Sequence, residues 1–272
     1  MHRLKKLSLP YLIWMIVLVV APSILILILS FSDLDIYNLG SFKFSLEHVR
    51  ELNRPEIIVA VKNSIRLSFY ATLACFVIGY PVAYYLANMK SKNKTLLVTL
   101  LIVPVWSNMI LRIIAWEKLF YPKSILNDVF NLSLDLIGKD IAIIIGMVSL
   151  YLPFMVLPIY SVLEKMDKSL IEASKDLGAN GFVTFKRVIL PLSMSGVVSG
   201  TIMTLLPAMT AFALPERLSR GKTLLLGNII EEYFVSSNKM NLGSLISIML
   251  MGVIVIMFVA ILKFDKEGET LI

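Results

Sequence analysis

Residues 141–163 read IAIIIGMVSLYLPFMVLPIYSVL, and this stretch decides the fold. It holds 23 residues, none of which is charged. A helix rises about 1.5 Å per residue, so a helix of this length crosses the roughly 30 Å hydrocarbon core of a bilayer. The stretch therefore predicts a membrane-spanning helix.

Five further segments have the same character. The six predicted spans are residues 9–31, 62–87, 96–116, 141–163, 192–215 and 240–262. The second contains an uncharged stretch at 67–87, and the third carries Arg112 near its far end. The chain is 57% hydrophobic and only 17% charged, against about 25% charged residues in soluble domains. We therefore expect an all-α integral membrane protein with six transmembrane helices, forming one domain over residues 1–272.

The distribution of Lys and Arg predicts the orientation of these spans, because cytoplasmic loops carry an excess of both. With the N-terminus inside, the inner segments hold 13 Lys and Arg. The longer outer loops hold 11, besides Arg66 at a span end. The first span is longer than the 7–15 apolar residues typical of a signal peptide, so we expect it to be retained. This predicts a multi-pass protein with both termini in the cytoplasm.

Several classes of function are disfavoured by the composition. Cys75 is the one cysteine, and His2 and His48 lie far apart, so neither a metal site nor a Ser-His-Asp site is expected. The net charge of +7 is explained by the basic inner loops rather than by nucleic acid. Gly221-Lys222-Thr223 looks like the end of a phosphate-binding loop, but Glu216 stands where that motif requires glycine. We expect no nucleotide site and no enzymatic reaction on this chain.

The inner loop at 164–191 has a recognisable local pattern. Ser169 followed by Glu172 forms a capping-box pattern, so we expect a helix from Leu170. Gly178 stands where a left-handed residue would end that helix. Asn180-Gly181 predicts a turn, and a second helix should run from there to a stop at Pro191. The first helix has a partly apolar face, which suits either lipid headgroups or another protein.

From Glu172 to Pro191 the loop reads EASKDLGANGFVTFKRVILP, which resembles the EAA motif of ATP-binding-cassette (ABC) importer permeases. That pattern is Glu-Ala-Ala, three residues, Gly, nine residues, Ile-x-Leu-Pro. This chain departs from it at Ser174 and Val188, both conservative changes. The resemblance implies a type I ABC importer permease fold in the bacterial inner membrane. It also implies that the first helix of the loop docks on an ATPase subunit through Ile171, Glu172, Ala173 and Gly178.

The resemblance also implies the partners. They are a second permease subunit, two ATP-binding subunits and an extracytoplasmic solute-binding protein, with membrane lipid around the spans and no nucleic acid. ATP would be bound by a partner subunit, so no cofactor is expected on this chain. Further segments within residues 61–235, such as LIVPVWSNMILRI from Leu101, are similar to the first permease subunit of spermidine/putrescine importers. This similarity implies polyamine transport by alternating access.

A polyamine carries several positive charges, so its path should offer carboxylates or aromatic faces. No Asp or Glu lies in any of the six predicted spans. We therefore expect an aromatic wall, with acids supplied by the partner permease. The candidate path residues are Trp106, Asn108, Tyr151, Phe154 and Tyr160. Trp116, at the end of its span, suits an interfacial position better.

Other polar features of the spans have ordinary interpretations. Arg66 and Arg112 are expected to reach towards the membrane interface. Pro104, Pro153, Pro158 and Pro207 are expected to interrupt helices, either exposing carbonyls to a polar path or only kinking them.

Two alternatives to polyamine import remain. One is an importer of the same architecture for an iron-, sulfate- or thiamine-type solute. The other is an ion-coupled secondary transporter, which the lack of acids in the spans disfavours.

Overall fold

The computed structural model describes residues 14–33, 43–124, 129, 135–236 and 239–264. Over these residues the secondary structure is helical, apart from an isolated bridge between Ser32 and Phe44. Three helices are long and apolar enough to cross a membrane. They are α4 (Pro55–Asn88), α8 (Asp140–Lys165) and α15 (Met240–Phe264). The all-helical membrane character predicted from the sequence is confirmed.

Two further candidate spans are bent pairs of helices, whereas the sequence predicted straight helices. α5 (Lys94–Trp106) and α6 (Met109–Phe120) meet at 93°, where the sequence predicted one span over 96–116. The helical segment Gly181–Leu192 meets α12 (Met194–Met209) at 63°. If each bent pair counts as one span, the described residues hold up to five.

The first predicted span is described only in part. Its described helical portion consists of η1 (Ile16–Val20), a π-helical segment, and α2 (Ala21–Ser30). Residues 9–13 of that prediction lie outside the described residues.

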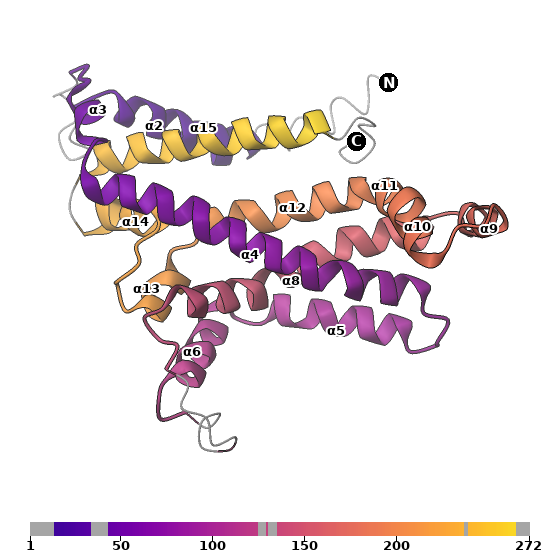
Figure 1. Cartoon of the computed structure of the whole chain (residues 1–272). Helices are drawn as coiled ribbons and strands as arrows, with labels where there is room; N and C mark the ends of the chain where they lie inside the picture. The colour runs from indigo at the N-terminus through magenta and orange to yellow at the C-terminus, as the bar shows by residue number, and fades with distance from the viewer. Residues whose placement is uncertain (1–13, 34–42, 125–128, 130–134, 237–238, 265–272) are drawn as a thin grey trace.

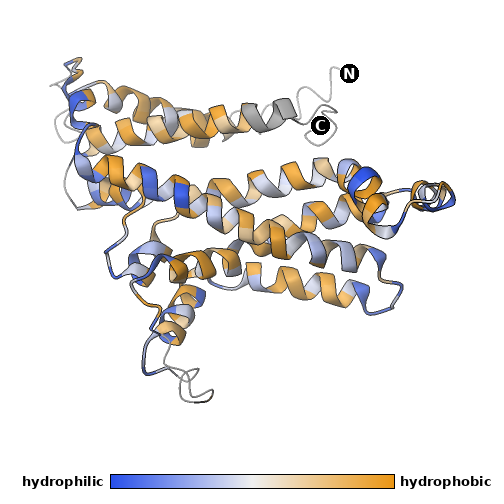
Figure 2. Cartoon of the chain, viewed as in Figure 1, coloured by the Kyte–Doolittle hydropathy of each residue, from blue (hydrophilic) through white to orange (hydrophobic). Residues whose placement is uncertain are grey.

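The centre of the molecule is the packing of α4, α8 and α12, which run side by side in Figure 1. Leu67 of α4 and Ile143, Met147 and Met155 of α8 are fully buried in this core. Figure 2 shows the spans as mostly apolar and the ends of the helices as polar. The apolar periodicity of the sequence therefore reflects both burial and membrane contact.

Two glycines bring α12 close to α8. A Cβ placed at Gly196 would lie 2.9 Å from the Ile159 Cα and from the Pro158 carbonyl oxygen. A Cβ at Gly200, one turn further on, would lie 2.9 Å from the Met155 carbonyl oxygen. Small residues at such a four-residue spacing allow helix backbones to approach in membranes.

A second cluster joins α15 to the start of α4 and to α14 (Leu226–Val235). α2 packs along α15, and the two helices lie together on one side of the molecule in Figure 1. Up to Val259, the part of α15 whose side chains the structure describes, the buried residues lie between Leu242 and Leu250. Met251, Val255 and Ile256, further along the helix, are exposed, which leaves apolar surface for lipid or another subunit.

The predicted fifth span, 192–215, is also shorter than expected. α12 ends at Met209, and α13 (Ala213–Ser219) follows as a separate helix. Pro207 removes a donor from the last turn of α12. The backbone of α14 occupies the break, because a Cβ at Gly227 would lie 2.5 Å from the Thr210 carbonyl oxygen.

The prolines inside α8 do not interrupt it, contrary to expectation. Pro153 and Pro158 both lie within a continuous helix of 26 residues. Pro104 and Pro207 each lie in the last turns of their helices, just before breaks. In lipid a proline is tolerated inside a helix where other groups bond the carbonyl it frees.

The two ends of the bundle differ in character. The α4–α5 turn and α9 (Lys168–Asp176) lie at one end in Figure 1. The short helix α3 (Glu47–Glu51), α13 and α6 lie at the other end. The inner and outer loops predicted from charge therefore separate to opposite ends of the molecule.

Candidate functional site

α9 projects from one end of the bundle, and an aspartate begins it. The Asp167 carboxylate accepts a hydrogen bond from the Ser169 backbone N–H at 2.9 Å, and the helix starts at Lys168. The prediction that Ser169 caps a helix from Leu170 is therefore wrong by two residues. The hydrogen bonds from Ser169 hold the pKa of Asp167 below its usual range. The cap is thus charged at neutral pH and would be lost only as pH falls through that lowered value.

Gly178 ends α9 as predicted, with φ at +82°. Its N–H bonds the Lys175 carbonyl at 2.8 Å, and the Ala179 N–H bonds the Ser174 carbonyl at 3.0 Å. These two bonds make a Schellman motif, which requires a left-handed residue at the position of Gly178. A Cβ there would meet nothing within 4 Å, so the backbone angle rather than space within this chain favours glycine.

The second half of the loop leads back towards the membrane. Asn180 caps α10 (Gly181–Thr184) by accepting from the Val183 N–H at 2.9 Å. A π-helical turn, η3 (Phe185–Ile189), and α11 (Leu190–Leu192) follow without interruption. The predicted stop at Pro191 is wrong, because Pro191 lies at the start of α11, where a missing N–H is tolerated.

The residues of the loop fall on two faces. Ile171 is half-buried and packs against the main core, whereas Glu172 and Ala173 are exposed. Leu177 is 89% exposed and Phe182 is 74% exposed. Exposed apolar side chains on a polar loop suit contact with another protein or with lipid.

Ser174, where the family pattern has alanine, joins the two parts of the loop. Its hydroxyl lies 2.9 Å from that of Thr184, which is buried, and it also donates to the Ile171 carbonyl. The departure from the pattern thus adds a hydrogen bond between α9 and α10. The two segments also border a hollow of about 390 Å³.

Asn108 lies at the break between α5 and α6 and acts as the N-cap of α6. Its side-chain oxygen accepts from the N–H groups of Ile110 and Leu111, at 2.9 and 3.4 Å, and so caps α6. Trp106, the last residue of α5, is 86% exposed. The sequence signal for this break was Asn108 itself, a preferred N-cap residue shortly after Pro104.

Arg112 stabilises the same break rather than reaching out to the interface. Its guanidinium donates to the Pro104 carbonyl at 3.1 Å and to the Ser149 carbonyl at 2.5 Å. Pro153 lacks the N–H that would otherwise bond the carbonyl four residues earlier, at Ser149. A carbonyl freed by proline is therefore used inside the chain.

The remaining aromatic candidates are less exposed than Trp106 and make contacts within the chain. Tyr151 is only 6% exposed, and its hydroxyl donates to the Pro207 carbonyl at 3.3 Å. Tyr160 lies under the Lys94 ammonium, 5.4 Å from nitrogen to ring centroid. Phe154 is half-buried against the main core, and Trp116 stacks on Phe120 with centroids 5.1 Å apart.

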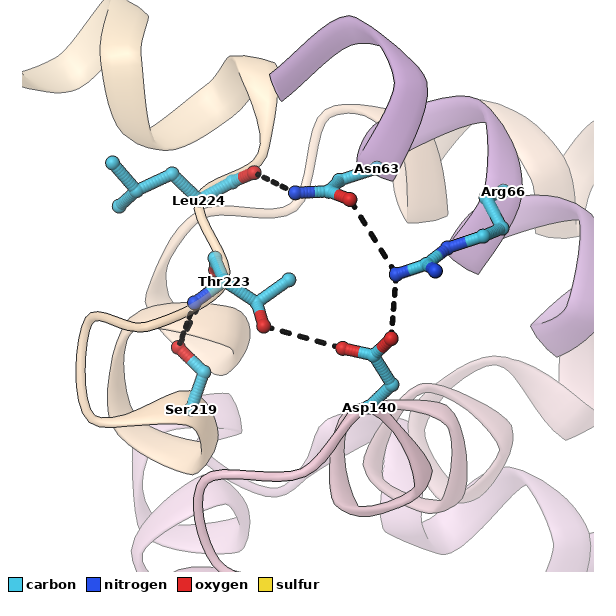
Figure 3. A network of polar contacts seen from close by, with 6 residues as sticks. All are labelled: Asn63, Arg66, Asp140, Ser219, Thr223 and Leu224. Carbon is cyan, nitrogen blue, oxygen red and sulfur yellow. Dashed lines mark hydrogen bonds and ion pairs between the residues drawn. The ribbon is translucent and has the colours of Figure 1, made fainter. Parts of the chain in front are cut away.

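A polar network joins three elements at the opposite end from α9 (Figure 3). Arg66 of α4 forms an ion pair with Asp140, the first residue of α8. The Thr223 hydroxyl donates to the same carboxylate at 3.2 Å, and Asn63 donates to the Leu224 carbonyl at 3.3 Å. Figure 3 shows Arg66 and Thr223 converging on Asp140 from two sides.

This network explains two features of the sequence. The charge of Arg66 is balanced by Asp140, so Arg66 does not present an unpaired cation at this end. The Gly221-Lys222-Thr223 triplet forms a turn, with Gly221 at φ +73°, whose threonine is bonded to Asp140. The triplet is thus part of the network rather than the start of a phosphate-binding helix.

Sequence reasoning did not anticipate a gathering of acidic side chains near the same end. Glu216, Glu231 and Glu232 border one pocket of about 250 Å³ between α13 and α14. They come from two helices, so their proximity depends on tertiary packing.

The chain matches the family described as "Binding-protein-dependent transport system inner membrane component" over residues 1–265. It is 38% identical over 264 residues to the spermidine/putrescine transport system permease protein PotB of Haemophilus influenzae, covering 95% of this chain and 91% of that protein. It is 37% identical over 255 residues to PotB of Escherichia coli, covering 90% of this chain and 92% of that protein.

Solved structures show the same fold at low sequence identity. A chain of a bacterial ABC transporter involved in the import of the acidic polysaccharide alginate aligns with a TM-score of 0.80 at 14% identity, covering 98% of this chain and 96% of that chain. A chain of the MetNI methionine ABC transporter aligns with a TM-score of 0.52 at 19% identity, covering 80% of this chain and 94% of that chain.

Proposed function

Because the chain belongs to the family of inner-membrane components of binding-protein-dependent transport systems, we propose that it is the permease subunit of an ATP-driven polyamine importer. The choice of polyamine as the solute rests on the identity of 37–38% to two spermidine/putrescine permeases over at least 90% of this chain. The likeness to the alginate transporter, at 14% identity, supports the fold alone.

The proposed assembly contains this chain, a second permease, two ATP-binding subunits and an extracytoplasmic solute-binding protein. ATP binds and is hydrolysed on the partner subunits, and this chain needs no cofactor of its own. The exposed apolar half of α15 and the exposed face of α2 provide surface for the second permease and for lipid. The proposed topology has six spans, counting the two bent pairs and the first helix, with both termini and α9 on the cytoplasmic side, as the excess of Lys and Arg in the inner loops favours.

The proposed mechanism is alternating access driven through the loop at residues 164–191, here named the coupling loop. Glu172 and Ala173 offer an exposed face of α9 to the ATPase, while Ile171 faces back towards the main core of this chain. Gly178 sets the direction in which the chain leaves α9. Closure of the ATPase dimer would then move α9 and the helices joined to it.

The solute path is proposed to pass Trp106 at the break between α5 and α6. Trp106 is almost fully exposed, so its indole face is open to a cation or to a neighbouring subunit. A desolvated ammonium group over such a face gains about 2 kcal/mol. Asn108, which caps α6 at the same break, and Phe154 remain candidates. In this conformation Tyr151 and Tyr160 are held by contacts within the chain.

The uptake of labelled spermidine tests the function. The chain is expressed with its second permease, ATPase and binding protein in cells that lack other polyamine importers. ATP-dependent uptake that excess putrescine competes away is the expected result. A complex that assembles and hydrolyses ATP without importing either polyamine would contradict the solute, and uptake of iron, sulfate or thiamine would then identify the solute class.

Replacing Trp106 with leucine is expected to lower spermidine uptake about thirtyfold, because the loss of a cation–π contact of about 2 kcal/mol weakens solute passage. Assembly should be unaffected, since an exposed side chain contributes little to folding. Trp14→Leu is the matched control, because Trp14 is also exposed, at 66%, but lies on the first helix. Equal uptake by the two variants would remove Trp106 from the path.

A further inference from the structure

α5 has few apolar contacts with the rest of the chain. None of its residues, all of which the structure describes, is buried. Leu97, Val98 and Leu101 touch the main core and are half-buried. Apolar packing drives helix association weakly in lipid, so polar contacts count for more. α5 has two well-formed polar contacts, one at each end, and both lead to α8.

The first contact is made by Lys94, the first residue of α5. Its ammonium lies 2.8 Å from the Glu164 carboxylate and donates to the Ala87 carbonyl at 3.2 Å. It also lies over the Tyr160 ring, and the Tyr160 hydroxyl bonds Glu164. The Lys94 side chain is only 20% exposed. An isolated surface ion pair contributes little, but three groups that fix one ammonium, two of them bonded to each other, form a network.

The position of Glu164 makes this contact relevant to coupling. Glu164 lies in the last turn of α8, three residues before Asp167 caps α9. Any force on α9 therefore reaches the end of α8 at the point where Lys94 is attached. Only two residues separate the end of α8 at Lys165 from the start of α9 at Lys168, so the two helices cannot move far independently.

The second contact is made by Arg112 of α6, whose guanidinium reaches the far end of α5. It joins the Pro104 carbonyl, near the end of α5, to the Ser149 carbonyl in the middle of α8. A cation beside the last carbonyls of a helix also suits the negative end of the helix dipole. α5 is thus attached to α8 at both ends by cationic side chains.

From these contacts we infer that Lys94 and Arg112 are positioning residues that fasten α5 to α8, so that α5 moves with the helix leading into α9. This inference rests on the proposed function, because it assigns the route by which the coupling loop moves the α5–α6 break. Trp106 lies at the end of α5, so a movement of α9 would change the position of Trp106 together with α8.

A distance measurement tests the attachment without using the solute. Spin labels are placed at Thr99→Cys on α5 and Ser161→Cys on α8, both exposed positions. Cys75, the single native cysteine, is buried and does not compete for the label. Dipolar EPR on the complete complex is expected to give the same distance between the two labels in the nucleotide-free and ATP-trapped states. Adding Lys94→Gln should make that distance change with nucleotide.

The matched control is Lys92→Gln, which removes the same charge two residues earlier. Lys92 is exposed, and the described residues show no ion pair for it. The Lys92 variant should leave the two distances equal. If the distance changes with nucleotide in the labelled protein that keeps Lys94, the inference is overturned. It is also overturned if Lys94→Gln and Lys92→Gln give the same distances in both nucleotide states.

Transport gives the second readout. Lys94→Gln is expected to lower spermidine uptake per ATP hydrolysed by roughly threefold or more, the size typical of coupled neighbours. The exchange of Lys94→Glu with Glu164→Lys should restore part of that ratio. An unchanged ratio in Lys94→Gln would overturn the inference. If the complex without these variants hydrolyses ATP but imports no polyamine, only the proposed solute is contradicted. The distance measurement still tests whether α5 is attached to α8.

Discussion

Replacement of Gly178 by valine is expected to abolish solute uptake while the complex still assembles. Gly178 has φ at +82°, where a residue with a Cβ costs about 1–2 kcal/mol and a β-branched residue more. The strain would break the Schellman motif and redirect the chain after α9. A misdirected α9 cannot transmit movement of the ATPase, so ATP hydrolysis should continue without uptake. Spermidine uptake and ATPase rate, measured on the same preparation, check this.

Two variants separate the backbone effect from a contact with the ATPase. Gly178→Asn should retain most uptake, because asparagine tolerates left-handed angles and a Cβ at this position meets nothing within 4 Å in this chain. Gly181→Val is the matched control at an open position without a positive φ. Loss of uptake with asparagine as well would show that the space at Gly178 is occupied by the partner.

Replacement of Gly196 by valine is expected to prevent formation of the folded subunit. The new Cβ would lie 2.9 Å from two backbone atoms of α8, and backbone cannot rotate away as a side chain can. Overpacking costs about 1–3 kcal/mol where side chains can adjust, so a clash with backbone should reach or exceed that range. The amount of monodisperse protein extracted from the membrane measures the loss.

The matched control for Gly196 lies on another span. Gly252 of α15 is exposed, and a Cβ there would meet nothing within 4 Å. Gly252→Val should give normal amounts of subunit. A normal yield of Gly196→Val would mean that α8 and α12 can separate without loss of the fold.

The long spans could be predicted closely because an uncharged run is a local property. The predicted span 141–163 differs from α8 by one residue at its start and two at its end. The bend between α5 and α6 could not be predicted in the same way. It depends on Arg112 reaching the Ser149 carbonyl, a contact between residues 37 positions apart.

In the coupling loop the end of α9 could be predicted from the sequence, but its start could not. Gly178 was identified because a helix end requires a residue that accepts positive φ. The start of the same helix was placed two residues late, because Asp167 and Ser169 are both good caps and the sequence contains both. Which of two adjacent caps is used depends on how the end of α8 directs the chain.

The candidate path residues were selected by type and depth, which does not determine their neighbours. Trp106 is exposed as a path residue should be, whereas Tyr151 is turned into the core by its bond to the Pro207 carbonyl. Tyr160 belongs to the network around Lys94. Their roles in transport remain predictions for the uptake measurements described above.

The pairing of α2 with α15 has a consequence for synthesis of the chain. α2 is the first described α-helix to leave the ribosome, and its main partner, α15, is the last. Throughout translation of the intervening residues, α2 can be covered only by lipid or by the insertion machinery. A chain that stops after α14 would therefore lack the helix on which its first span packs, and translation must finish before the subunit can be completed.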